Sequence, residues 1–114
     1  MSARNRTEGQ QRYADYWAKQ MADPAFRQIY AEEARKKALW LQLVEARQAA
    51  GFTQQQVAER MGVSQAQVAR IEQRGYDAYT LRTLRRYLNA LGEDFSLEVA
   101  VMKEPQAAPQ PTTL

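Results

Sequence analysis

Two short segments that begin alike, one on each side of a glycine, limit the possible folds more than any other feature of the chain. In FTQQQVAERMGVSQAQVARIE, residues 52–72, Thr53 and Ser64 each precede a glutamine-rich helical pattern, and Gly62 separates the two patterns. A hydroxyl residue in such a place caps a helix, because its side-chain oxygen accepts a backbone N–H of the first turn. The sequence therefore predicts two short helices joined by a tight turn, a helix-turn-helix unit.

The glutamines of the two segments differ in position. Gln56 and Gln67 lie three residues after a hydroxyl residue, so each completes a capping box of the form S/T-x-x-Q. Capping does not account for Gln54, Gln55 and Gln65, which occupy the first exposed positions of their helices. We expect the apolar residues of the unit to face inward: Val57, Ala58, Met61, Val63, Val68 and Ile71.

The exposed glutamines suit the recognition of duplex DNA. In a helix-turn-helix unit the first residues of the second helix enter the major groove, where a glutamine amide pairs with adenine and an arginine pairs with guanine. We predict base contacts from Ser64, Gln65, Gln67 and Arg70. We predict phosphate contacts from Gln54, Gln55 and Arg74. All seven basic residues between 38 and 91 are arginines, although a merely solvated surface is the alternative explanation of this charge.

Composition and periodicity predict the other segments. Residues 1–9 are polar without periodicity and residues 104–114 contain three of the four prolines, so we expect both to be disordered. Residues 10–37 are predicted to be a helical extension that binds a partner. Residues 38–92 are predicted to be the DNA-binding domain, with short helices at about 54–61, 65–74 and 81–91. Asp23-Pro24 is a helix-start signal, but residues 10–50 are compatible with one helix or two.

Residues 93–103 have a different period. Phe95, Leu97, Val99 and Val101 alternate with smaller or polar residues, which is typical of a half-buried β-strand. A single strand leaves its backbone groups unpaired, so we expect it to pair with its copy in a second chain and form a homodimer. The alternative is that Phe95 and Leu97 pack against helices of their own chain.

Six of the eleven aromatic residues lie between 13 and 40. Aromatic residues at helical spacing usually belong to a core, and we expect this of Phe26 and Trp40. The extension lies outside a minimal DNA-binding domain, however, and aromatic side chains also dominate protein interfaces. The candidate residues for binding a protein partner are Tyr13, Tyr16, Trp17, Phe26 and Tyr30.

Composition excludes several classes of function. The 114 residues include no cysteine and no histidine, which removes thiolate metal sites, Cys and His nucleophiles and the usual general base. We therefore expect no enzyme activity, no metal and no cofactor. The N-terminus has no signal-peptide apolar region, and the longest apolar stretch, ALWLQLV, is too short to cross a bilayer. A cytoplasmic protein without membrane contact is the expectation.

The segment ARQAAGFTQQQVAERMGVSQAQVARIEQRG, residues 46–75, resembles the helix-turn-helix of the Cro/C1 (xenobiotic-response-element type) repressor family. The spacing R-x-x-x-G-[hydrophobic]-T-Q begins at Arg47, and G-V-S-x-x-x-[V/I]-x-x-[I/L]-E ends at Glu72. TLRTLRRYLNALG resembles the next helix of the same domain. The resemblance implies a structural ion pair between Arg47 and Glu72, and binding of a dimer to a palindromic operator in double-stranded DNA.

The whole arrangement is similar to HigA-type antitoxins of type II toxin–antitoxin systems. The expected fold is mainly α: a helical N-terminal extension, a Cro/C1-type helix-turn-helix bundle and one C-terminal β-strand for dimerisation. The resemblance implies neutralisation of a small basic RelE-like ribonuclease toxin and autorepression of the operon. Because residues 1–37 are themselves net basic, contact with such a toxin would depend on the aromatic face or on the acidic residues Asp15, Asp23, Glu32 and Glu33. The alternative is a stand-alone phage-type or housekeeping repressor.

Overall fold

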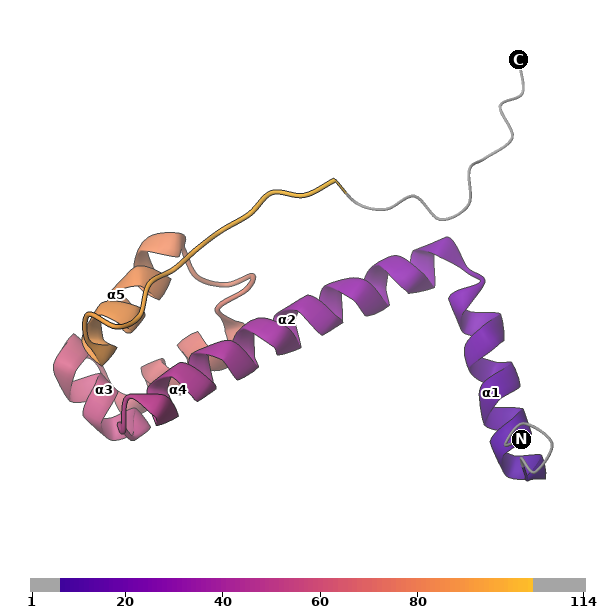
Figure 1. Cartoon of the computed structure of the whole chain (residues 1–114), viewed down its shortest axis with the longest axis horizontal. Coiled ribbons are helices and arrows are strands. Elements are labelled where there is room, and N and C mark those ends of the chain that lie inside the picture. The colour runs from indigo at the N-terminus through magenta and orange to yellow at the C-terminus, as the bar shows by residue number, and fades with distance from the viewer. Residues whose placement is uncertain (1–6, 104–114) are drawn as a thin grey trace, which may run out of the picture. The chain divides into compact units, whose positions relative to one another are not determined.

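The computed structural model describes residues 7–103, which contain five helices (Figure 1): α1 (Glu8–Met21), α2 (Pro24–Ala49), α3 (Gln54–Met61), α4 (Gln65–Arg74) and α5 (Leu81–Leu91). The mainly helical fold and the three short helices are confirmed. Residues 10–50 form two helices rather than one, because the chain leaves the helical path before Pro24 and the Asp23 carboxylate accepts the backbone N–H of Ala25 at 2.9 Å. The disorder expected for residues 104–114, and for most of 1–9, falls outside the described residues.

Two compact units share the chain. One contains α1 and the first part of α2, and the other contains residues Glu33–Met102. In the second unit, α3 packs against both α4 and α5. Its core takes residues from four helices: Leu43, Val57, Ala58, Val68, Ile71, Leu84, Tyr87, Leu88, Ala90 and Leu91.

The inward-facing residues of the helix-turn-helix unit are confirmed. Val57, Ala58, Val68 and Ile71 are fully buried, and Met61 and Val63 pack against them. The expected core position of Trp40 is wrong, because its side chain remains 36% exposed and lies outside the core cluster. The face of α2 that meets the other helices is a narrow stripe through Leu39, Leu43 and Ala46, and Ala50 continues it just after the helix ends.

The turns between the short helices follow from local chemistry. Thr53 and Gln56 form the expected capping box, with both reciprocal hydrogen bonds present. Gly62 ends α3 with φ at 74°, a left-handed conformation that glycine adopts without a steric penalty. The second expected capping box is only half formed: Ser64 accepts the backbone N–H of Gln67, and no return bond from the Gln67 side chain occurs in the described chain.

Two arginines fasten α3 to α5 through main-chain oxygens. Arg60 Nε donates to the carbonyl of Ala90 near the end of α5, and its guanidinium lies 4.8 Å from the centre of the Phe52 ring. In the opposite direction, Arg86 donates to the carbonyl of Met61 at the end of α3, at 3.2 Å. The last carbonyls of a helix lack partners within the helix, so these cations stabilise both ends.

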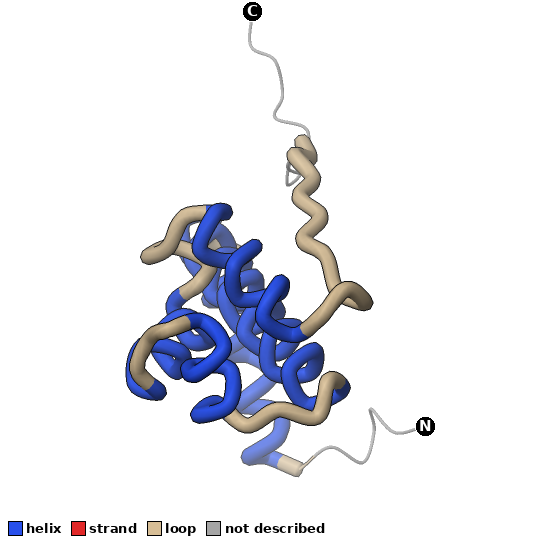
Figure 2. The backbone as a smooth tube through the Cα atoms, turned by 90° about the vertical axis from the view of Figure 1, so that its left-hand side faces the viewer, coloured by secondary structure: helices blue, strands red, loops and turns tan. Residues whose placement is uncertain are grey.

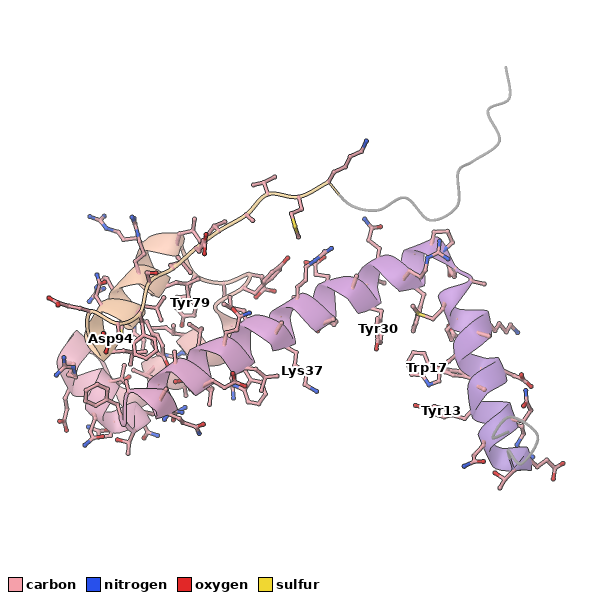
Figure 3. All side chains as sticks on the ribbon, in the orientation of Figure 1. Tyr13, Trp17, Tyr30, Lys37, Tyr79 and Asp94 are labelled. Carbon is pink, nitrogen blue, oxygen red and sulfur yellow. The ribbon has the colours of Figure 1, made fainter. Side chains whose placement is uncertain are left out.

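The N-terminal unit is held together by aromatic rings. Trp17 lies at the centre, with ring-centre distances of 6.1 Å to Tyr13, 5.8 Å to Tyr16, 5.9 Å to Phe26 and 5.9 Å to Tyr30. Figure 3 shows Tyr13 and Trp17 of α1 directed toward the side of α2 that carries Tyr30. We call these five residues the aromatic cluster.

Few of the cluster's side chains are enclosed. No residue of α1 is buried, and Tyr13, Tyr16 and Tyr30 are 67%, 55% and 50% exposed. Phe26 was expected in the core, but its side chain is only half-buried within this cluster.

The start of the first helix is also corrected. The helical extension was expected to begin at residue 10, but α1 begins at Glu8, because Thr7 and Gln10 form a capping box.

The segment after α5 is neither helical nor paired. Figure 2 shows it as loop, and within the described chain residues 93–103 form no β-strand. Phe95 and Leu97 pack against the core of their own chain, as in the alternative reading, whereas Val99 and Val101 are exposed. A ladder of hydrogen bonds needs a second strand, which one chain does not supply here, so pairing in a dimer remains a prediction.

Candidate nucleic-acid interface

The first turn of α4 presents a row of exposed side chains. Ser64, Gln65 and Ala66 are exposed, Gln67 is half-buried, and Arg70 is exposed one turn further along the helix. Val68 and Ile71 are buried on the opposite side and fix the rotation of α4 about its axis. The predicted base-contacting residues thus lie at the accessible end of a helix that the core holds in place.

A buried carboxylate joins the helices beneath this surface. Glu72 of α4 is 1% exposed, and its Oε2 accepts from Arg47 Nε of α2 at 2.6 Å and from the hydroxyl of Tyr87 of α5. Its Oε1 accepts from Gln54 Nε2 of α3 at 2.8 Å. The ion pair that the resemblance implied between Arg47 and Glu72 is therefore present, with two neutral donors beside it. Both carboxylate oxygens are satisfied, as a buried charge requires.

The protonation states suit this arrangement. Burial raises the pKa of the Tyr87 hydroxyl, and the hydrogen bond to Glu72 together with the charge of Glu72 raises it further. Tyr87 therefore keeps its proton and remains a donor. Burial lowers the pKa of Arg47, but its hydrogen bond to Glu72 and the neighbouring negative charge outweigh this effect, so the pKa lies above the ordinary value. Arg47 also donates to the carbonyl of Phe52 at 3.0 Å, which braces the turn before α3.

The glutamines at the two helix starts contact each other. Gln65 Nε2 donates to Gln54 Oε1 at 3.1 Å, so the amide of Gln54 bridges the buried carboxylate and the exposed start of α4. An open depression of about 620 Å³ lies at this point. Its lining consists of Arg47, Gln48, Gly51, Phe52, Thr53, Gln54, Gln55 and Gln65. Most of these residues have polar side chains, and the depression lies at the N-terminal end of α3, where backbone N–H groups favour a phosphate.

The arginines of the domain divide into structural and available groups. Arg47, Arg60 and Arg86 are bound to acceptors within the domain. Four others are exposed, and their side chains make no hydrogen bond or ion pair with residues 7–103: Arg70, Arg74, Arg82 and Arg85. Arginine is the residue best suited to phosphate and guanine, so α4 and α5 carry positive charge free for a nucleic acid.

The predicted contact residues are not equally free. Gln55 donates to Glu59 at 3.3 Å along its own helix, and the amide of Gln54 is hydrogen-bonded to both Glu72 and Gln65.

Sequence reasoning missed Tyr87, whose hydroxyl binds Glu72. Its only sequence signal is an aromatic residue on the apolar side of the amphipathic pattern from 81 to 91.

Metal sites and membrane spans were sought in the part of the chain that the structure describes. No cluster of three or more His, Cys, Asp or Glu side chains among residues 7–103 could hold a metal ion. None of the five described helices is long and apolar enough to cross a membrane.

Comparisons with known proteins identify the same part of the chain. A family model described as helix-turn-helix matches residues 43–97, which contain the end of α2 and all of α3, α4 and α5. Searches of curated proteins and of solved structures found no match. The matched segment is 55 of the 114 residues. Together with the geometry of α3 and α4, the match supports a helix-turn-helix domain and the role of a sequence-specific DNA-binding transcription regulator.

Proposed function

We propose that the protein is a dimeric repressor that binds a palindromic operator and also acts as the antitoxin of a small basic ribonuclease toxin. The observation that carries DNA recognition is the exposed first turn of α4, held by the buried Glu72 network beneath it. Its amide and guanidinium groups suit binding rather than catalysis, so the proposal is a DNA-binding protein of the cytoplasm without enzyme activity.

Base contacts are assigned to Ser64, Gln65, Gln67 and Arg70, and phosphate contacts to Gln55 and Arg74. Dimerisation supports this function because it gives two recognition helices about 34 Å apart, the spacing of successive major grooves on one face of B-DNA. Exposed Val99 and Val101 supply apolar side chains for the pairing of residues 93–103 between two chains.

The aromatic cluster supports a protein partner. Ordering the 14 residues of α1 costs conformational entropy, and no buried residue of α1 offsets that cost within one chain. Tyr13, Tyr16 and Tyr30 instead leave a large apolar area exposed, which is typical of an interaction surface. A basic partner would also meet the exposed acidic residues Asp15 and Glu32 of the same unit.

Two single variants separate base readout from general DNA affinity. Gln65→Ala should weaken operator binding by about 1–3 kcal/mol and relax the preference at one base pair. Arg74→Ala should weaken binding to all sequences similarly and reduce the slope of log K against log salt by about one. Fluorescence anisotropy on the chain's own upstream region and on scrambled DNA, at several salt concentrations, measures both effects.

The control is Gln42→Ala, since Gln42 is exposed on α2 and belongs to no predicted contact. It should bind like the wild type. Equal losses of Gln65→Ala on operator and scrambled DNA would remove Gln65 from base readout. Specific DNA-binding proteins bind their site ~1,000-fold or more tightly than other DNA. A wild-type ratio of operator affinity to scrambled-DNA affinity of about one would contradict sequence-specific repression.

The antitoxin role is tested by co-expressing the chain with the protein of the adjacent reading frame. We expect a stable complex, and Tyr13→Ala should weaken it by about 2 kcal/mol or more if the exposed ring is an interface anchor. Gln28→Ala, an exposed residue of the same unit, should bind like the wild type in calorimetric titration. A chain that represses its promoter but forms no complex would be a stand-alone repressor.

A further inference from the structure

The hydrogen bonds around Gln54 have a direction that follows from chemistry alone. A carboxylate can only accept hydrogen bonds, whereas a glutamine amide has a donating and an accepting end. Because Gln54 meets the Oε1 atom of Glu72, it must point its NH₂ group inward. Its oxygen then faces outward, and there it accepts from the NH₂ group of Gln65 at 3.1 Å.

The carboxylate that sets this direction is itself held firmly. Glu72 is 1% exposed, and Arg47 and Tyr87 occupy its other oxygen. These donors come from α2 and α5, whereas Gln54 and Gln65 begin α3 and α4. The amide at the surface is thus connected to the core by two hydrogen bonds whose polarity cannot reverse while Glu72 is a carboxylate.

We propose that Glu72 is a positioning residue for base recognition, which acts through Gln54 to fix the orientation of the Gln65 amide. This inference rests on the proposed DNA-binding function. It also gives Gln54 a role other than the phosphate contact that its position suggests. With one N–H directed at Gln54, Gln65 offers a base one donor and one acceptor.

This orientation selects a base. Adenine presents an acceptor, N7, beside a donor, the N6 amino group, and so matches the pair of groups that Gln65 has left. Guanine presents two acceptors, N7 and O6, and would leave the Gln65 oxygen facing another oxygen. The fixed amide therefore favours A·T over G·C at the base pair it contacts.

The connection is tested first in the free protein, without DNA. The variant Gln54→Met has a side chain of similar length with no amide, and it leaves Arg47 and Tyr87 on Glu72. In ¹H–¹⁵N spectra of the full chain, the two side-chain NH₂ signals of Gln65 should move toward those of exposed Gln42 in this variant. Gln73→Met, an exposed change on α4, should leave the Gln65 signals in place. Unchanged Gln65 signals in Gln54→Met would overturn the proposal.

The recognition step is tested by affinities for operators that differ only at the base pair contacted by Gln65. Gln54→Met should reduce the preference for A·T over G·C by roughly 5- to 150-fold, the range that corresponds to one bidentate base contact. Glu72→Gln should reduce the same preference, because its amide accepts either end of Gln54. Thermal unfolding of each variant shows whether the domain remains folded, and Gln54→Met carries the test if Glu72→Gln does not fold.

A uniform loss of affinity in Gln54→Met, with the A·T preference intact, would make Gln54 a phosphate contact and overturn the proposal. If Gln54→Met shifts the Gln65 signals but the wild-type chain shows no operator preference at all, the proposed DNA-binding function fails, and the recognition role of Glu72 fails with it. The free-protein spectra and the wild-type titration thus keep the two failures distinct.

Discussion

Replacing Glu72 by alanine is expected to lower the unfolding free energy of the helix-turn-helix domain by about 3–5 kcal/mol. The loss arises from what remains after the change. Arg47 keeps a charge with a side chain only 12% exposed, and Gln54 loses its acceptor. Tyr87 loses Glu72 and keeps only the Leu43 carbonyl, at 3.2 Å. Urea unfolding of the full chain, followed by circular dichroism, measures the difference.

Glu93→Ala provides the matched control, since Glu93 is exposed beyond the end of α5 and no hydrogen bond or ion pair to it occurs within residues 7–103. It should change the unfolding free energy by less than about 0.5 kcal/mol. A domain of this size has about 5–15 kcal/mol of stability, so the Glu72 variant should lie close to unfolding. A loss below about 1 kcal/mol would show that water or other groups replace the carboxylate.

A double variant separates the unpaired charge from the loss of packing. Removing both Arg47 and Glu72, as Arg47→Met with Glu72→Met, should cost less than the sum of the two single changes, because each single change leaves an unpaired buried charge and the double change leaves none. The remaining cost then reports on Gln54 and Tyr87. Additive losses would mean that the ion pair itself contributes no coupling to the stability of the domain.

The helices of the domain could be predicted closely, because their ends depend on local chemistry. Thr53, Gly62 and Ser64 define caps through residues at most three positions away, and α3 and α4 have the predicted bounds. The same rule would have found the start of α1, since Thr7 and Gln10 repeat the S/T-x-x-Q pattern. The half-formed box at Gln67 shows that the pattern permits the return bond without requiring it.

Contacts between distant residues could not be derived in this way. Arg47 and Glu72 are 25 residues apart, and their pairing was expected only from the family resemblance. Periodicity places Tyr87 on the buried side of α5 but does not reveal that its hydroxyl meets Glu72. Trp40 was misplaced because helical spacing defines an apolar side, whereas only packing defines how much of that side the neighbouring helices cover.

The segment after α5 shows how one sequence pattern can serve two roles. Its first half is anchored, because Phe95 and Leu97 pack against the core. Its second half carries Val101, which is 98% exposed and so gains nothing from its own chain. The proposed dimer gives this second half a partner strand, and the difference between the two halves makes the dimer testable.

Replacing both Val99 and Val101 by proline is expected to convert the proposed dimer to a monomer. Proline has no N–H to donate to a ladder of hydrogen bonds, so pairing with the second chain should fail. Light scattering after size exclusion should give the chain mass of 13.1 kDa for the variant and twice that mass for the wild type. Operator affinity should fall by about 100-fold or more, because each recognition helix then binds its half-site alone.

The exposure of Val101 makes this a clean test, because the two changes should leave the unfolding of the single domain nearly unaltered. Val101→Thr retains both the N–H and the β-branched shape, so it should remain dimeric and bind the operator like the wild type. If the wild-type chain is itself a monomer, packing of Phe95 and Leu97 is the whole role of the segment. A palindromic operator would then need the second copy to be recruited by DNA or by the protein partner.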